Sequence, residues 1–192
     1  MALPKEYLSH LAPELVKRLE KSGKVRLPDK AAAAARVQQA FLDDSVREDQ
    51  LNQEVRDYLA QYNEQIRRDG ISYQEMYQLV KKELVKKYKM LPSGGRDRDG
   101  GKLSRDKIIE FSHRLVKDLA ALPQADFTAE KNDVRLEIMH QLQALLKEEA
   151  AIDQAVRQKI QSQKREIADG SAEWDILFRK YYSEEMRKLG VS

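Results

Sequence analysis

The sequence DGSAEWDILFRKYYSEEMRKL, residues 169–189, contains the only tryptophan of the chain and a dense aromatic band. Gly170 favours the left-handed turn that ends a helix, and Ser171 suits the cap position of the next one. The large apolar residues that follow recur at intervals of three and four: Trp174, Leu177, Phe178 and Tyr181. This spacing predicts an amphipathic helix whose apolar stripe packs against a core.

An earlier stretch, DGISYQEMYQLVKKELVKKY at residues 69–88, follows the same plan. Its apolar residues also share one helical face: Tyr73, Met76, Tyr77, Val80 and Leu84. The likeness extends along the chain, because Leu15-Val16-Lys17 recurs as Leu115-Val116-Lys117 and Val55-Arg56 recurs as Val156-Arg157. We interpret the chain as a tandem duplication of one helical unit, since similarity at a nearly fixed offset marks a repeated fold.

The predicted fold class is all-α, with two tandem copies of a three-helix unit that each have a long central helix. The copies span residues 1–90 and 102–192, and a flexible, glycine-rich linker at residues 91–101 joins them. Each copy is short for a domain that folds alone, so we expect the copies to pack together or to dimerise.

In the first copy, we expect an N-terminal helix with either a kink at Pro13 or a delayed start near Ala12, because proline removes a helical hydrogen bond. Asp29 suits the cap of a long second helix. Ser45 and Glu48 have the spacing of a capping box, so the pattern leaves open whether this helix is continuous or broken near Ser45. Its later apolar face is predicted to comprise Leu51, Val55, Tyr58, Leu59, Tyr62 and Ile66.

Gly70 is expected to end that helix, and Ser72 with Glu75 to form a capping box for the third helix. In the second copy, Ser104 caps the first helix, and residues 132–166 form an unbroken long helix. The buried face of the first of these helices is predicted to consist of Ile108, Phe111, Leu115 and Leu119.

Composition narrows the class of protein. The chain has 192 residues, of which 35% are charged and 7% aromatic, and this is typical of a soluble, helix-rich protein. It lacks cysteine, which excludes disulfides, thiolate nucleophiles and zinc–thiolate sites. We find neither an apolar run of membrane-spanning length nor the hydrophobic segment of a secretion signal. We therefore expect a cytoplasmic protein without a membrane partner.

One resemblance rests on residues of the second copy. They are Lys107-Ile108-Ile109, then Glu148-Glu149, Ile152-Asp153 and Val156-Arg157, and finally Gly170-Ser171-x-Glu173-Trp174-Asp175-Ile176-Leu177-x-Arg179-Lys180-Tyr181-Tyr182. With these residues, the segment 103–190 resembles a bacterial family known as the domain of unknown function numbered 507. Residues 3–90 look like a degenerate second copy, with Tyr73 in place of Trp174. The resemblance implies a small helical domain and brings no activity or catalytic residue with it.

Candidate metal ligands occur in two pairs, Glu110-x-x-His113 and Glu137-x-x-His140. Ferritin-like bundles hold metal ions with such one-turn pairs. The spacing arises easily in a chain rich in glutamate, and the first copy has neither pair, so we expect no metal and no other cofactor. The sequence also lacks a nucleophile elbow, a Walker loop and a dinucleotide fingerprint. An enzyme is therefore not expected.

The favoured function is protein binding or scaffolding. Two like units on a pliant linker suit a bivalent adaptor or a self-associating protein. On the third helix of the second copy, Tyr182, Arg179 and Met186 are predicted to contact a partner, while Trp174, Phe178 and Tyr181 are assigned to the core.

The alternative function is binding of RNA or DNA through a basic helix face. Its candidate residues are Lys82, Lys86, Lys89, Lys180 and Arg187. Lysine and arginine on one face could follow a phosphate backbone. Glutamates at 83, 184 and 185 interleave with these cations, so an ordinary solvated surface is the competing interpretation.

Overall fold

In the computed structural model, the described residues are 3–62, 70, 72–91, 103–163, 167–168 and 171–188. They form six helices, which confirms the all-α prediction, and one pair of two-residue strands. The elements in chain order are α1 (Lys5–Lys21), β1 (Val25–Arg26), α2 (Lys30–Gln61), α4 (Tyr73–Lys87), α5 (Arg105–Ala120), β2 (Asp126–Phe127), α6 (Lys131–Gln161) and α7 (Ala172–Lys188). The predicted linker after Leu91 and the turn at Asp169-Gly170 lie outside the described residues.

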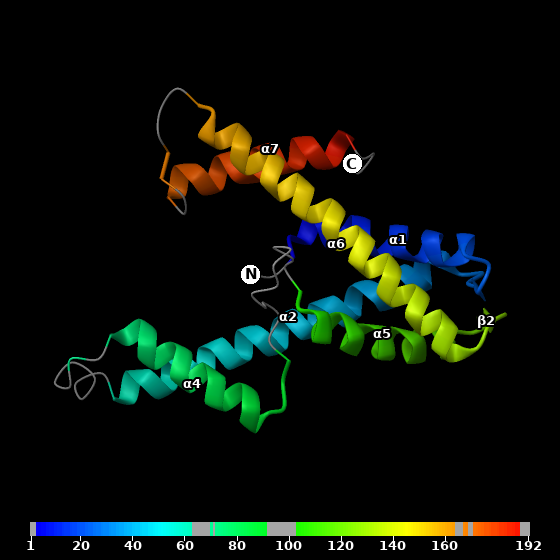
Figure 1. The fold of residues 1–192 in the computed structure, drawn as a ribbon, viewed down its shortest axis with the longest axis horizontal. Coiled ribbons are helices and arrows are strands. Elements are labelled where there is room, and N and C mark those ends of the chain that lie inside the picture. Colours follow the sequence, from blue (N-terminus) through cyan, green and yellow to red (C-terminus); the bar gives the residue numbers. More distant parts are fainter. Residues whose placement is uncertain are drawn as a thin grey trace.

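Four helices form a central bundle. α1 packs against α2 and α6, and α5 packs against α6 and α2. The long helices α2 and α6 then extend out of the bundle and diverge (Figure 1). α4 packs on the projecting part of α2, and α7 packs on that of α6. We call residues 45–62 of α2 and its cap, together with residues 72–91, the first arm, and residues 146–161 with α7 the second arm.

Both halves of the chain contribute to one core. The buried residues of α1 and the turn before it are Leu3, Tyr7, Leu8, Leu11, Ala12, Leu15, Val16 and Leu19. The residues exactly one hundred positions later are all buried too: Leu103, Lys107, Ile108, Phe111, Ser112, Leu115, Val116 and Leu119. α1 and α5 therefore bury matching positions in the bundle. The expectation that the halves pack together is met within a single chain.

The loops after α1 and α5 meet at one end of the bundle. Val25 pairs with Phe127 and Arg26 with Asp126 in an antiparallel ladder. Thr128 extends this contact, since its amide and hydroxyl donate to the carbonyls of Lys24 (3.1 Å) and Gly23 (2.6 Å). The all-α prediction did not include this pair of strands. The ladder forms because backbone groups brought together at this end find partners in the opposite loop.

Polar side chains cap the helices largely as predicted. Asp29 accepts a hydrogen bond from the Ala32 amide at 2.8 Å, and Ser72 with Glu75 forms the expected capping box. The remaining predicted caps accept amide hydrogen bonds three residues on: Ser104 from Lys107 (3.3 Å) and Ser171 from Trp174 (3.2 Å). Gly70 has a φ of +66°, but the prediction that it ends the second helix is wrong, because α2 ends at Gln61 with Tyr62 as its C-cap.

The structure decides two alternatives that the sequence left open, and it ends α6 earlier than predicted. α1 begins at Lys5 and includes Pro13, so the delayed start near Ala12 is wrong. α2 is continuous through Ser45. Its neighbouring acidic residues bind α5 side chains rather than ending the helix. α6 ends at Gln161, before the predicted end at residue 166, and Ser162 takes the C-cap position.

The two arms differ in their packing. The second arm continues the main core, which includes Trp174, Tyr182 and Met186 of α7. In the first arm, Val55 and Leu59 form a separate small cluster. Half-buried residues of α4 cover this cluster: Met76, Tyr77, Val80 and Leu84. The predicted burial of Tyr58, Tyr62 and Tyr73 is wrong, because all three are exposed. Ile66 lies outside the described residues.

Candidate functional site

The predicted partner contacts on α7 are mostly in the core. Tyr182 and Met186 are only 3% and 2% exposed, whereas Arg179 is exposed. The expected exposed flank is therefore wrong for Tyr182 and Met186. The packed row runs from the buried Trp174 through the half-buried Phe178 to the buried Tyr182, with ring centroids 4.7 and 5.6 Å apart. Residues four apart form the ridges by which helices pack, and α7 uses this row against α6.

Tyr182 belongs to a buried polar group where α7 meets the bundle. Its hydroxyl donates to the buried carboxylate of Glu149 at 3.1 Å. Tyr7, which is fully buried, donates to the Leu145 carbonyl at 2.5 Å. Burial raises the pKa of both tyrosines, and negative charge raises each further, first from Glu148 for Tyr7 and from Glu149 for Tyr182. Both hydroxyls thus stay protonated and serve as fixed donors between helices.

Because of the raised pKa values of Tyr7 and Tyr182, we expect the free energy of unfolding to fall at high pH. Their pKa values are raised on folding, so their contribution is present below the ordinary tyrosine pKa near 10 and declines as pH rises above it. Each tyrosine should add about 1.4 kcal/mol per pH unit to the fall in free energy of unfolding. Urea unfolding between pH 9 and 11 should show a smaller slope for Tyr7→Phe with Tyr182→Phe. An equal slope in both proteins would exclude this origin.

The junction at the base of the first arm is ionic. Lys107, which is 2% exposed, forms an ion pair with Asp44 and contacts Glu110 at 2.8 Å. Lys81 of α4 lies 3.6 Å from Glu48. A cavity of about 10 Å³ lies among these side chains and is too small for a ligand. This junction joins α2, α4 and α5 through charged side chains, whereas the junction of α7 with the bundle uses tyrosine hydroxyl groups.

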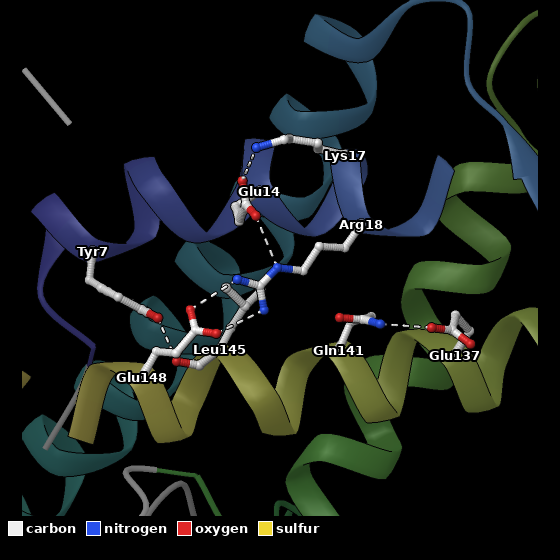
Figure 2. A network of polar contacts seen from close by, with 8 residues as sticks. All are labelled: Tyr7, Glu14, Lys17, Arg18, Glu137, Gln141, Leu145 and Glu148. Carbon is white, nitrogen blue, oxygen red and sulfur yellow. Dashed lines mark hydrogen bonds and ion pairs between the residues drawn. The ribbon is translucent and has the colours of Figure 1, made fainter. Parts of the chain in front are cut away.

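A further polar network lies between α1 and α6 (Figure 2). The Arg18 guanidinium donates two parallel hydrogen bonds to Glu148, both at 3.0 Å, and a third to Glu14 at 3.0 Å. Gln141 donates to Glu137 at 2.8 Å. These side chains are half-buried or exposed, so their role is to orient α1 on α6 rather than to dominate stability.

The carboxylates of the two candidate metal-ligand pairs take part in protein contacts. Glu110 binds Lys107. Glu137 accepts from Gln141 and pairs with Lys24 at 2.7 Å, and these interactions lower its pKa. His113 and His140 are exposed. Within the described ranges, no group of three or more such ligands is placed to hold a metal ion.

Exposed large hydrophobic side chains are concentrated on the first arm. Eight large hydrophobic side chains are exposed among the described residues, and six of these lie on this arm. The six are Val46, Tyr58, Tyr62, Tyr73, Leu79 and Tyr88. The rings of Tyr58 and Tyr62 lie 5.0 Å apart, and those of Tyr73 and Tyr77 lie 6.4 Å apart. Exposed apolar residues gathered in one region are typical of an interaction surface.

A family model described as "Protein of unknown function (DUF507)" matches residues 1–191. The chain belongs to the DUF507 family. The match includes both halves of the chain, so it extends beyond residues 103–190, on which the resemblance rested. No curated protein matches the sequence. In the part of this DUF507 chain that the structure describes, no helix has the length and apolar character needed to cross a membrane.

The predicted basic residues of this DUF507 protein are exposed but do not form one surface. Lys82, Lys86 and Lys89 belong to the first arm, and Lys180 and Arg187 belong to the second (Figure 1). Lys86 pairs with Glu83 at 2.8 Å. The structure therefore offers two separate basic regions.

Sequence patterns missed the buried charges of this DUF507 fold. Lys107 and Asp44 were not predicted to lie in the core, yet they join its two halves. A signal was present, because Lys107 lies four residues before Phe111 and four after Leu103 on an apolar stripe. A second hollow, of about 210 Å³, lies between residues 27–32 and 122–125. It is smaller than most ligand pockets.

Proposed function

We propose that the protein is a non-enzymatic binding or scaffolding protein whose first arm supplies the partner surface. One observation carries this proposal: most of the exposed large apolar side chains described in the chain gather on that arm. The buried titratable groups support it too, because Lys107, Asp44, Glu149 and Tyr182 make contacts that join helices. Tyrosine is also favoured at the centres of protein interfaces.

The proposal includes a tandem origin, with one three-helix unit in residues 1–90 and another in residues 102–192. The matching burial of α1 and α5 supports it. The strand ladder supports it further, since exchange of the two halves at an offset of 101 maps the pair Val25–Phe127 onto the pair Arg26–Asp126. Two units give two arms. The molecule would then present a first arm with a small cluster of its own and a second arm that is packed into the main core.

The test is affinity purification of the full chain from its native cells, with and without nuclease. We expect a partner that survives nuclease and is lost when Tyr58→Ala, Tyr62→Ala and Leu79→Ala are combined. The matched control is Leu136→Ala, because Leu136 is similarly exposed but lies outside the first arm. Recovery of the same partner by the triple variant would contradict the assigned surface.

Nucleic-acid binding is the second candidate, favoured by the exposure of Lys82, Lys86 and Lys89 on one short segment. Phosphate contacts weaken steeply with salt. If this function is correct, the partner should disappear after nuclease treatment, and Lys82→Glu with Lys86→Glu should abolish RNA or DNA binding at low salt. Absence of binding at low salt would remove this candidate.

A further inference from the structure

The outer helices of the two arms are attached in different ways. α7 buries three side chains in the main core. α4 buries none among its described residues. Its half-buried side chains cover Val55 and Leu59, and it also lines one side of the small cavity beside Lys107. Removing α7 would open the main core to water. Removing α4 would uncover this small cluster, which is separate from that core, and one side of the ionic junction around Lys107.

The polar contacts of α4 lie beside this cluster. The Tyr77 hydroxyl donates to the Asn52 side-chain oxygen at 3.0 Å, and the Lys81 ammonium lies 3.6 Å from the Glu48 carboxylate. Glu48 and Asn52 are one helical turn apart, so they occupy one face of α2. We call Glu48, Asn52, Val55 and Leu59 the α2 strip. It combines an apolar end with one carboxylate and one amide.

We propose that α4 is a replaceable cover and that the partner of the first arm is an amphipathic helix that displaces it from the α2 strip. This inference rests on the proposed binding function and names the kind of partner. The strip selects a helix with apolar residues at three- and four-residue spacing, a cation facing Glu48 and a hydrogen-bond donor facing Asn52. Such helix-in-groove binding is a common mode of recognition.

Charge complementarity supports this choice of occupant. Glu48 already holds a lysine ammonium, so a partner with an acidic residue at that position would meet like charge. α4 itself has the apolar residues, the cation and the hydrogen-bond donor that the α2 strip selects. A partner must therefore bind the strip more tightly than α4 does. A partner binds the uncovered arm, so its apparent affinity falls with the fraction of molecules in which α4 is released.

The probe for this mechanism is a labelled peptide of residues 72–91, which contains α4, added to the full chain. We expect saturable binding by fluorescence anisotropy. A peptide with Lys81→Glu should bind at least about tenfold more weakly, because it places a carboxylate against Glu48. A peptide of residues 171–188 should not exchange into the second arm, since α7 is held by the main core. Failure of the 72–91 peptide to bind would overturn the proposal.

A covalent cross-link that holds α4 on α2 provides the decisive control. The natural chain has no cysteine, so Glu54→Cys with Tyr88→Cys introduces two thiols that a short bis-maleimide can cross-link. These positions lie outside the α2 strip, and their natural side chains are joined by a 2.7 Å hydrogen bond. We expect the cross-linked arm to lose peptide binding, and the same variant with both thiols capped separately to keep it. Equal binding by both forms would contradict displacement of α4. If the cellular partner binds both forms equally, displacement is wrong while the proposed binding function stands.

Discussion

Replacing Lys107 with alanine should lower the free energy of unfolding by about 3–5 kcal/mol, one of the largest effects expected of a single substitution in this chain. Its side chain is almost fully buried and pairs with Asp44 across the interface between α5 and α2. Removing the ammonium leaves the Asp44 carboxylate in the core without its cation. A buried charge of that kind costs far more than the pair itself contributes.

A double variant separates the cost of the unpaired Asp44 carboxylate from the loss of packing around residue 107. Lys107→Met with Asp44→Leu removes both charges and keeps apolar volume, so we expect stability near or above that of the natural protein. Lys17→Ala, which removes an exposed partner of Glu14, should have little effect. Urea unfolding of all three proteins makes the comparison. If the double variant were as unstable as Lys107→Ala, the loss would come from packing and not from the uncompensated carboxylate.

Replacing Trp174 with alanine should lower the free energy of unfolding by about 3–5 kcal/mol, while Tyr73→Ala, at the position that the proposed repeat aligns with it, should lower it by less than about 1 kcal/mol. Trp174 is 9% exposed, stacks on Phe178 and lies beneath the Arg157 guanidinium, 5.0 Å from its ring. Tyr73 is 48% exposed. Thermal and urea unfolding can measure both changes. Trp174→Phe is the control, since it keeps an aromatic ring in the core and should lose less than the alanine variant.

Equal losses at Trp174 and Tyr73 would mean that both outer helices are held alike. That result would contradict the difference between the arms.

Periodicity predicted the helices well because their apolar stripes are long and their caps are local. Ser72 with Glu75 and Asp29 act within one turn of chain, so their roles can be deduced without tertiary information. The row of side chains that α7 packs against α6 was harder to predict from the sequence. Trp174 begins two overlapping stripes, one through Tyr181 and one through Tyr182, and the angle at which α7 crosses α6 decides between them.

The exposed tyrosines of the first arm show a second limit. Tyr58 and Tyr62 continue the apolar face of α2, and a helix in a bundle would have neighbours on both sides of that face. The first arm consists of two helices, so α4 covers a narrower stripe that centres on Val55 and Leu59. Periodicity alone does not reveal how many helices surround a given turn. The candidate surface therefore emerged only from the fold.

Hydrogen exchange on the full natural chain tests most directly the claim that the first arm is held apart from the core. We expect the amides of α4 to exchange through local opening, with protection at least about 100-fold lower than that of α7. The amides of α7 should exchange only when the main core opens. Equal protection of the two helices would contradict the account, because it would place α4 in the same cooperative unit as the core.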